Sequence, residues 1–132
     1  ALEHAIPQTF GPMFGVRHGL SCAIALSYVM EYNLPVIPGK FAQVATAFGE
    51  SVDGLTSLEA GMKAVDAVRK LAEDVDIPAN LKEVGVPEDA LQKMAGDIVS
   101  GKARQDFGFL ANVRKSSKED LLNLLRKMWK GR

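Results

Sequence analysis

The chain has 132 residues, which by length corresponds to one domain or at most two very small ones. Its 47% hydrophobic and 24% charged residues are ordinary for a globular protein and exclude a disordered chain. Sixteen basic and sixteen acidic residues cancel, so we expect no nucleic-acid partner. The single cysteine excludes an internal disulfide and a multi-cysteine zinc site, and we expect a reducing, cytoplasmic location.

The most apolar stretch, residues 20–30, is shorter than the ~20 residues that cross a bilayer, so no membrane partner is expected. The first residues lack the basic and apolar regions of a secretory signal. The sequence begins with Ala1 rather than Met. That start leaves open a processed end, a trimmed tag and a cut inside a longer protein.

The first predicted helix covers residues 20–32, where apolar residues occur on most faces. It ends at Asn33, because Pro35 disfavours a helical conformation in the residue before it. A short helix over residues 40–48 follows and is terminated by Gly49.

A capping box of Thr56 and Glu59 predicts the start of the clearest amphipathic helix, which Ile77 and Pro78 close. Apolar residues recur along it every three or four positions, and the predicted apolar stripe consists of Leu58, Met62, Val65, Val68, Leu71, Ala72 and Val75.

After residue 80 the sequence predicts a single helical turn over residues 81–84 and then a helix from Pro87 to about Gly101. Residues 102–115 show no periodicity and are expected to form a long loop. Ser116 and Glu119 form a second predicted capping box before the final helix. The residues expected to face inward from these two helices are Leu91, Met94, Ala95, Ile98, Leu121, Leu122, Leu125, Met128 and Trp129. The sequence therefore predicts one all-α domain over residues 1–132, a helical bundle of roughly five to seven helices.

No glycine-rich phosphate-binding motif occurs in the sequence, so these residues are not by themselves a nucleotide-binding domain. Gly11, Gly15 and Gly19 recur every four residues, and we expect them to serve packing or turns. Cys22 falls inside the most apolar predicted helix, where we expect it to act as a small hydrophobic residue.

His4 and His18 are the only histidines and lie fourteen residues apart. A turn between them would bring them to one metal ion, and Pro7, Gly11 and Gly15 favour turns. The spacing alone leaves two interpretations open, because isolated histidines are more often structural or surface residues than ligands.

The segment from His4 to Asn33 resembles the C-terminal domain of the iron-containing (group III) alcohol dehydrogenases. The likeness includes the step His18-Gly19-Leu20 and the run Tyr28-Val29-Met30-Glu31-Tyr32-Asn33. It continues in the family's order through Phe41-Ala42, Gly49, Leu58-Glu59-Ala60, Gly85-Val86-Pro87-Glu88-Asp89, Asn112-Val113-Arg114, Glu119-Asp120-Leu121-Leu122 and Trp129. Essentially the whole chain is covered.

This resemblance implies a two-domain enzyme in which an N-terminal α/β domain binds NAD or NADP and a helical domain binds the metal. His4 and His18 fall on two metal-ligand positions, for Fe2+ or Zn2+, whereas an Asp and a His of the ligand set lie in family segments upstream of this chain. The implied partner is a small alcohol or aldehyde, with hydride passing to or from the nicotinamide.

Three positions depart from the family pattern beside these histidines. Gln8 stands where the family often has another histidine, which puts a proton-relay role there in doubt. Arg17 replaces a usual proline and either favours an anionic substrate or faces water. Cys22 replaces a common asparagine.

The favoured function is therefore a fragment of a metal-dependent alcohol dehydrogenase, inactive in isolation, that supplies two metal-ligand histidines. The alternative is a non-catalytic helical remnant that acts as a structural or interaction module. In either case we expect an exposed apolar face around residues 4–32, through which the chain self-associates.

Overall fold

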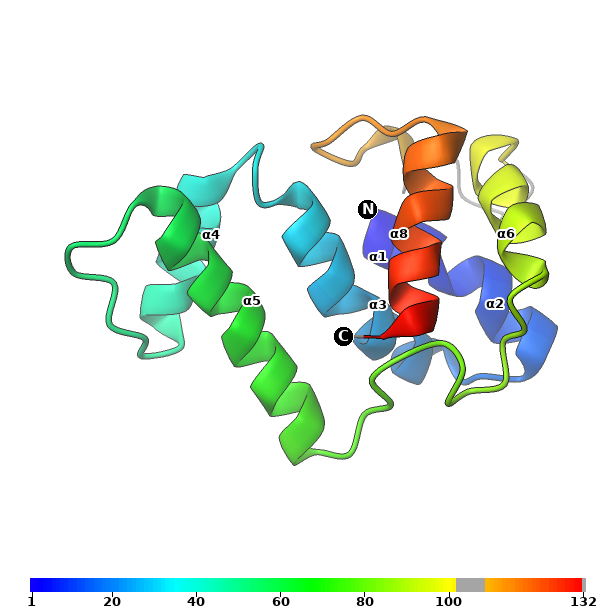
Figure 1. Ribbon diagram of the computed structural model, residues 1–132, viewed down its shortest axis with the longest axis horizontal. Helices are drawn as coiled ribbons and strands as arrows, with labels where there is room; N and C mark the ends of the chain where they lie inside the picture. The colour runs from blue at the N-terminus through cyan, green and yellow to red at the C-terminus, as the bar shows by residue number, and fades with distance from the viewer. Residues whose placement is uncertain (102–108, 132) are drawn as a thin grey trace.

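Helices form where apolar residues recur at three- and four-residue spacing. The computed structural model describes residues 1–101 and 109–131, and every regular element in those ranges is helical (Figure 1). The helices are α1 (Leu2–Ala5), α2 (Pro7–Phe14), α3 (His18–Asn33), α4 (Pro38–Ala47), α5 (Ser57–Asp74), α6 (Ala90–Val99) and α8 (Lys118–Lys130). Within the described residues the all-α prediction is confirmed, and the seven helices named above fit the expected five to seven. Among these helices, none combines the length and the apolar composition needed to cross a bilayer.

The predicted helices are present, with shifted starts. α3 begins at His18 because Arg17 is extended, and α4 begins with Pro38 in its first turn. α6 begins at Ala90 rather than Pro87, because the Ala90 amide first closes a tight turn onto the Pro87 carbonyl. The predicted turn near residues 81–84 is a hydrogen-bonded turn, not an α-helix, and Gly85 closes it at φ +80°. Half of the expected 102–115 loop, residues 102–108, lies outside the described residues. In the described half, residues 109–110 are helical and the rest form turns, bends and irregular chain.

The capping box at Thr56 and Glu59 is confirmed, since each residue's side chain accepts from the other's backbone amide. The predicted box at Ser116 and Glu119 is wrong by one residue. Ser117 and Asp120 cap α8 instead, whereas the Ser116 hydroxyl lies 2.7 Å from that of Tyr32. The pairs Ser116–Glu119 and Ser117–Asp120 both satisfy the capping-box pattern. Ser116 contacts Tyr32 of α3 instead of capping α8, so that Ser117 is the capping residue.

The buried residues form two separate clusters. The larger one lies among α1, α2, α3, α6 and α8, and its largest fully buried side chains include Phe10, Tyr28, Leu91 and Met128. Nearly all of the residues predicted to face inward from α6 and α8 are buried; Trp129 is only partly so. The smaller cluster consists of Met30, Ala45, Ala64 and Val65, where α4 packs on α5. These two helices project to one side of the remaining bundle, and we call them the α4–α5 arm (Figure 1).

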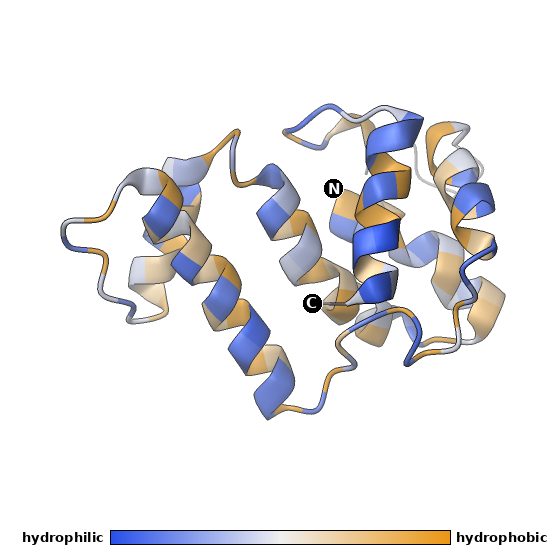
Figure 2. Ribbon diagram, in the orientation of Figure 1, coloured by the Kyte–Doolittle hydropathy of each residue, from blue (hydrophilic) through white to orange (hydrophobic). Residues whose placement is uncertain are grey.

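The apolar stripe predicted along α5 is only partly buried. Hydrophobic and hydrophilic residues alternate along the α5 ribbon (Figure 2). Leu58, Leu71 and Val75 are each more than half exposed. The residues that α5 buries are Val65 and the small residues Ala60, Gly61 and Ala64. Small side chains let α5 approach α4 closely, and this turns the larger apolar residues outward.

Within residues 4–32, where an exposed apolar face was expected, the exposed large hydrophobic residues are Met13 and Leu26. Phe48, Leu55 and the exposed residues of α5 lie outside this segment. Self-association stays a prediction.

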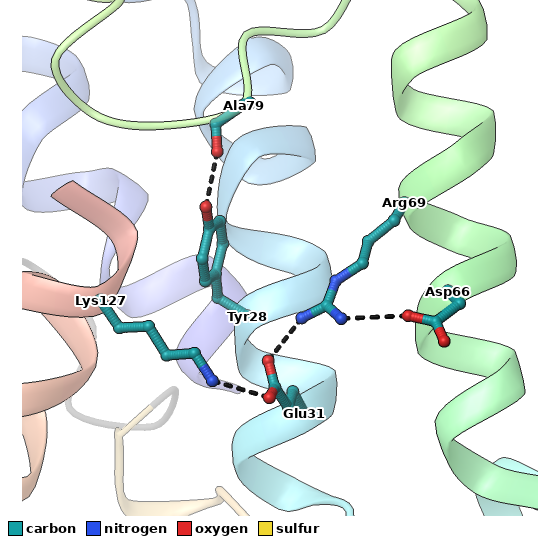
Figure 3. A network of polar contacts seen from close by, with 6 residues as sticks. All are labelled: Tyr28, Glu31, Asp66, Arg69, Ala79 and Lys127. Carbon is teal, nitrogen blue, oxygen red and sulfur yellow. Dashed lines mark hydrogen bonds and ion pairs between the residues drawn. The ribbon is translucent and has the colours of Figure 1, made fainter. Parts of the chain in front are cut away.

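A polar network around Glu31 of α3 joins α3 to both α5 and α8 (Figure 3). The Glu31 carboxylate accepts from Arg69 of α5 at 2.5 Å and from Lys127 of α8 at 2.7 Å. Arg69 also donates to Asp66 at 3.1 Å. Burial raises the pKa of Glu31, but the hydrogen bond from Lys127 and the charge of Arg69 outweigh it and lower this pKa below its ordinary value. The network therefore holds the arm and the last helix on α3.

Candidate metal centre

The N-terminal helices bring the two histidines to one place. α1 runs into α2 through the helical Ile6, and α2 ends at Gly15, which adopts the left-handed conformation with φ +68°. The chain then reverses into α3, whose first residue is His18.

Gly11 of α2 lies close against the start of α3. A Cβ atom at Gly11 would lie 3.1 Å from Ser21 Oγ and 3.2 Å from the Val16 carbonyl oxygen. The expected packing role of Gly11 and turn role of Gly15 are thereby confirmed. A Cβ at Gly19 would meet nothing within 4 Å, so no packing need is evident at that position.

His4 and His18 lie side by side, although thirteen residues separate them in the sequence. Their ring centroids are 4.6 Å apart, and the rings meet edge to face at 78°. The turn chemistry predicted between them is present as the end of α2. This geometry brings the imidazole nitrogens of α1 and α3 within reach of one ion.

Cys22 is the third member of this cluster, and sequence reasoning misplaced it. It is half-buried rather than enclosed in the core, and its Sγ lies 3.5 Å from His18 Nε2. The ligand atoms of His4, His18 and Cys22 all lie within 4.8 Å of one another. The signal that could have found Cys22 is its position four residues after His18, which puts both side chains on one face of a helix.

The surroundings of Cys22 favour the protonated form of its thiol. Burial raises the pKa of this thiol, and the negative charge of Glu3 raises it further. A metal ion bound there would therefore have to displace a proton.

A pocket of about 270 Å³ lies beside His18, which lines it together with residues that include Gln8 and Arg17. The Gln8 side-chain oxygen is buried, and among the described residues it has no hydrogen-bond partner. Arg17 is exposed at the rim of this pocket. Burying an amide oxygen without a hydrogen-bond donor is costly. Gln8 lines the same pocket as His18, and its oxygen is a neutral group that can accept a hydrogen bond or bind a cation.

The donor set fits a divalent transition metal. Imidazole nitrogen suits both iron and zinc, and a cysteine thiolate suits zinc. In the part of the chain that the structure describes, this is the cluster whose three donor atoms come close enough for one ion. Two histidines alone make an incomplete site, because catalytic metal sites use three or more protein ligands.

Comparison with known proteins gives a consistent result over the whole chain. The family model described as "Fe-containing alcohol dehydrogenase family, C-terminal" matches residues 1–129. The 1,3-propanediol dehydrogenase of Klebsiella pneumoniae is 33% identical over 123 residues, which cover 93% of this chain and 30% of that protein. Lactaldehyde reductase of Escherichia coli K12 is 31% identical over 132 residues, or 97% of this chain and 32% of that protein.

Solved structures agree with the sequence comparisons. A 1,3-propanediol oxidoreductase superposes with a TM-score of 0.85 at 32% identity, covering 96% of this chain and 32% of the other. The alcohol dehydrogenase of Oenococcus oeni gives a TM-score of 0.85 at 33% identity. The chain thus spans about a third of the length of the proteins that it matches.

Proposed function

Because this chain belongs to the iron-containing alcohol dehydrogenase family, we propose that it is the metal-binding part of an enzyme that interconverts small alcohols and aldehydes with NAD or NADP. In this proposal His4 and His18 are two of the metal ligands, and the metal is Fe2+ or Zn2+. Its relatives include proteins named for the oxidation or reduction of such small molecules, 1,3-propanediol and lactaldehyde.

The observation that carries the proposal is the approach of the two histidine rings to 4.6 Å. Histidine rings on separate helices have no packing need to converge at an exposed position, and His18 is exposed. A metal bound there would supply Lewis-acid polarisation of the substrate oxygen. The task of this chain is to hold two imidazole nitrogens in fixed positions, α1 contributing one and α3 the other.

The nicotinamide cofactor needs a binding domain that these 132 residues do not provide, since they contain no glycine-rich phosphate-binding motif. We therefore propose that the cofactor is bound by another part of the enzyme. The 132-residue chain should show no reduction of NAD or NADP with small alcohols in the presence of Fe2+ or Zn2+. Measurable turnover by the 132-residue chain would contradict the proposal that another part of the enzyme binds the cofactor.

Metal binding by the chain itself tests the ligand assignment. Zinc titration calorimetry on the 132-residue chain should show binding that is at least about tenfold weaker in His4→Ala and in His18→Ala, since even second-shell changes cost 10–100-fold. Gln92→Ala on α6, an exposed position, is the matched control and should bind zinc as the unchanged chain does. Unaltered affinity in both histidine variants would contradict the assignment of His4 and His18 as ligands. Absence of zinc binding by the unchanged chain would favour the alternative, a helical module without a metal.

A further inference from the structure

We propose that Cys22 is a third metal ligand, so that the chain presents a set of two imidazoles and one thiolate to the ion. The inference rests on the proposed role of His4 and His18. It goes beyond that role, because it adds a donor of different chemistry from the same chain and changes which ion the site prefers.

The first argument is the placement of Cys22 on α3. His18 and Cys22 are one helical turn apart, the spacing at which helices in metalloproteins offer two ligands from one face. α3 is continuous over both residues, so its backbone holds the two side chains in a fixed relation.

The second argument is the distance between the donor atoms. Sγ of Cys22 and Nε2 of His18 are 3.5 Å apart. Zinc–sulfur and zinc–nitrogen bonds of about 2.3 and 2.05 Å at a tetrahedral angle place sulfur and nitrogen about 3.6 Å apart. This pair therefore needs almost no rearrangement to bind one ion.

His4 completes the set from a second helix. The widest separation among the three donor atoms is below 4.8 Å, and it must shorten by up to about 1.5 Å in a tetrahedral site. Rotation of an imidazole ring about its side-chain bonds covers such a distance.

The chemistry of the thiolate determines the preference of the site. On binding, the thiol loses its proton to solvent and the sulfur electron pair forms the bond to the ion, with no change of oxidation state. A site with a soft thiolate ligand favours Zn2+ more than a site with nitrogen and oxygen ligands alone does. We therefore expect this chain to prefer Zn2+ more strongly than a site in which residue 22 offers an oxygen or no ligand.

Cobalt spectroscopy of the 132-residue chain tests the proposal. Co2+ added to the unchanged chain should produce an intense near-ultraviolet thiolate-to-cobalt charge-transfer band. The band should be absent in Cys22→Ser, a nearly isosteric variant whose helical circular dichroism should match that of the unchanged chain. Cys22→Ser should also bind zinc at least about tenfold more weakly.

A second measurement needs no variant of Cys22. This residue is the only cysteine of the chain, so alkylation by iodoacetamide reports on it alone. Zinc should protect the thiol in the unchanged chain and should no longer protect it in the His4→Ala, His18→Ala double variant.

The outcomes separate this inference from the proposed function. Cobalt binding that needs the histidines but gives no charge-transfer band would overturn the thiolate and leave the histidine assignment intact. A band and full zinc affinity in the double histidine variant would overturn the histidine assignment, and with it the three-ligand set. Absence of any metal binding by the unchanged chain would overturn both.

Discussion

Glu31 is the residue through which α3 is tied to two other helices, and its protonation should affect stability. The folded chain lowers the pKa of Glu31, through Lys127 and Arg69 and against the effect of burial. A lowered folded pKa means that the stabilisation is present above the unfolded value, about 4.3 for glutamate, and is lost as pH falls through the folded value.

We predict that Glu31→Gln lowers the free energy of unfolding by about 1–2 kcal/mol at pH 7, because it removes the charge from two hydrogen bonds. The difference from the unchanged chain should shrink as pH falls below about 4. Urea unfolding at a series of pH values measures this. Glu88→Gln, at an exposed position, is the control; a difference for Glu31→Gln that persists unchanged at low pH would contradict the assignment.

At the scale of elements, the packing of α5 on α4 depends on the absence of a side chain at Gly61. A Cβ atom there would overlap the Leu34 Cδ1 methyl and lie 3.1 Å from Phe41 Cβ and 3.2 Å from the Pro38 carbonyl oxygen. Gly96 in α6 is different, since a Cβ there would meet only the Lys118 side chain at 3.8 Å.

These two glycines make a matched pair of substitutions. Gly96→Ala should stabilise the chain by about 0.5–1 kcal/mol, the gain in helix propensity. Gly61→Ala should destabilise it by about 1–2 kcal/mol, because overpacking exceeds the same gain. Urea unfolding of both variants measures the sign of the change in the free energy of unfolding. Stabilisation by Gly61→Ala would contradict the close packing of the arm around residue 61.

At the scale of the whole molecule, the separation of the two buried clusters predicts uneven stability. The cluster of the α4–α5 arm contains four buried residues, two of them alanine, whereas the main cluster draws on five helices. Local opening needs less free energy where fewer apolar contacts are lost.

Amide hydrogen exchange should therefore be faster in α4 and α5 than in the middle of α3 and α8, by about tenfold or more, which corresponds to about 1.4 kcal/mol. Exchange measured by mass spectrometry or nuclear magnetic resonance at neutral pH resolves the elements. Equal protection throughout would show that the Glu31 network couples the arm to the bundle as firmly as the main core holds its own helices.

The sequence by itself determined the class of the fold and most of its helices. Apolar residues at helical spacing, Pro87 near a helix start and the Thr56–Glu59 box are local signals, and local interactions suffice to satisfy them. The fourteen-residue step from His4 to His18 left a metal site and a structural role open, and the resemblance to the iron-containing alcohol dehydrogenases favoured the metal site.

Only the tertiary structure decided which of several equally good local patterns is used. Ser116 and Ser117 both fit a cap, and the contact of Ser116 with Tyr32 of α3 selects Ser117. Leu58 and Leu71 are apolar at core spacing, yet the close approach of α5 to α4 leaves them exposed. Cys22 looked like a core residue because its neighbours are apolar; α1 packs beside α3 so that this face carries the histidines instead. Burial depends on which element lies opposite, and that partner is distant in the sequence.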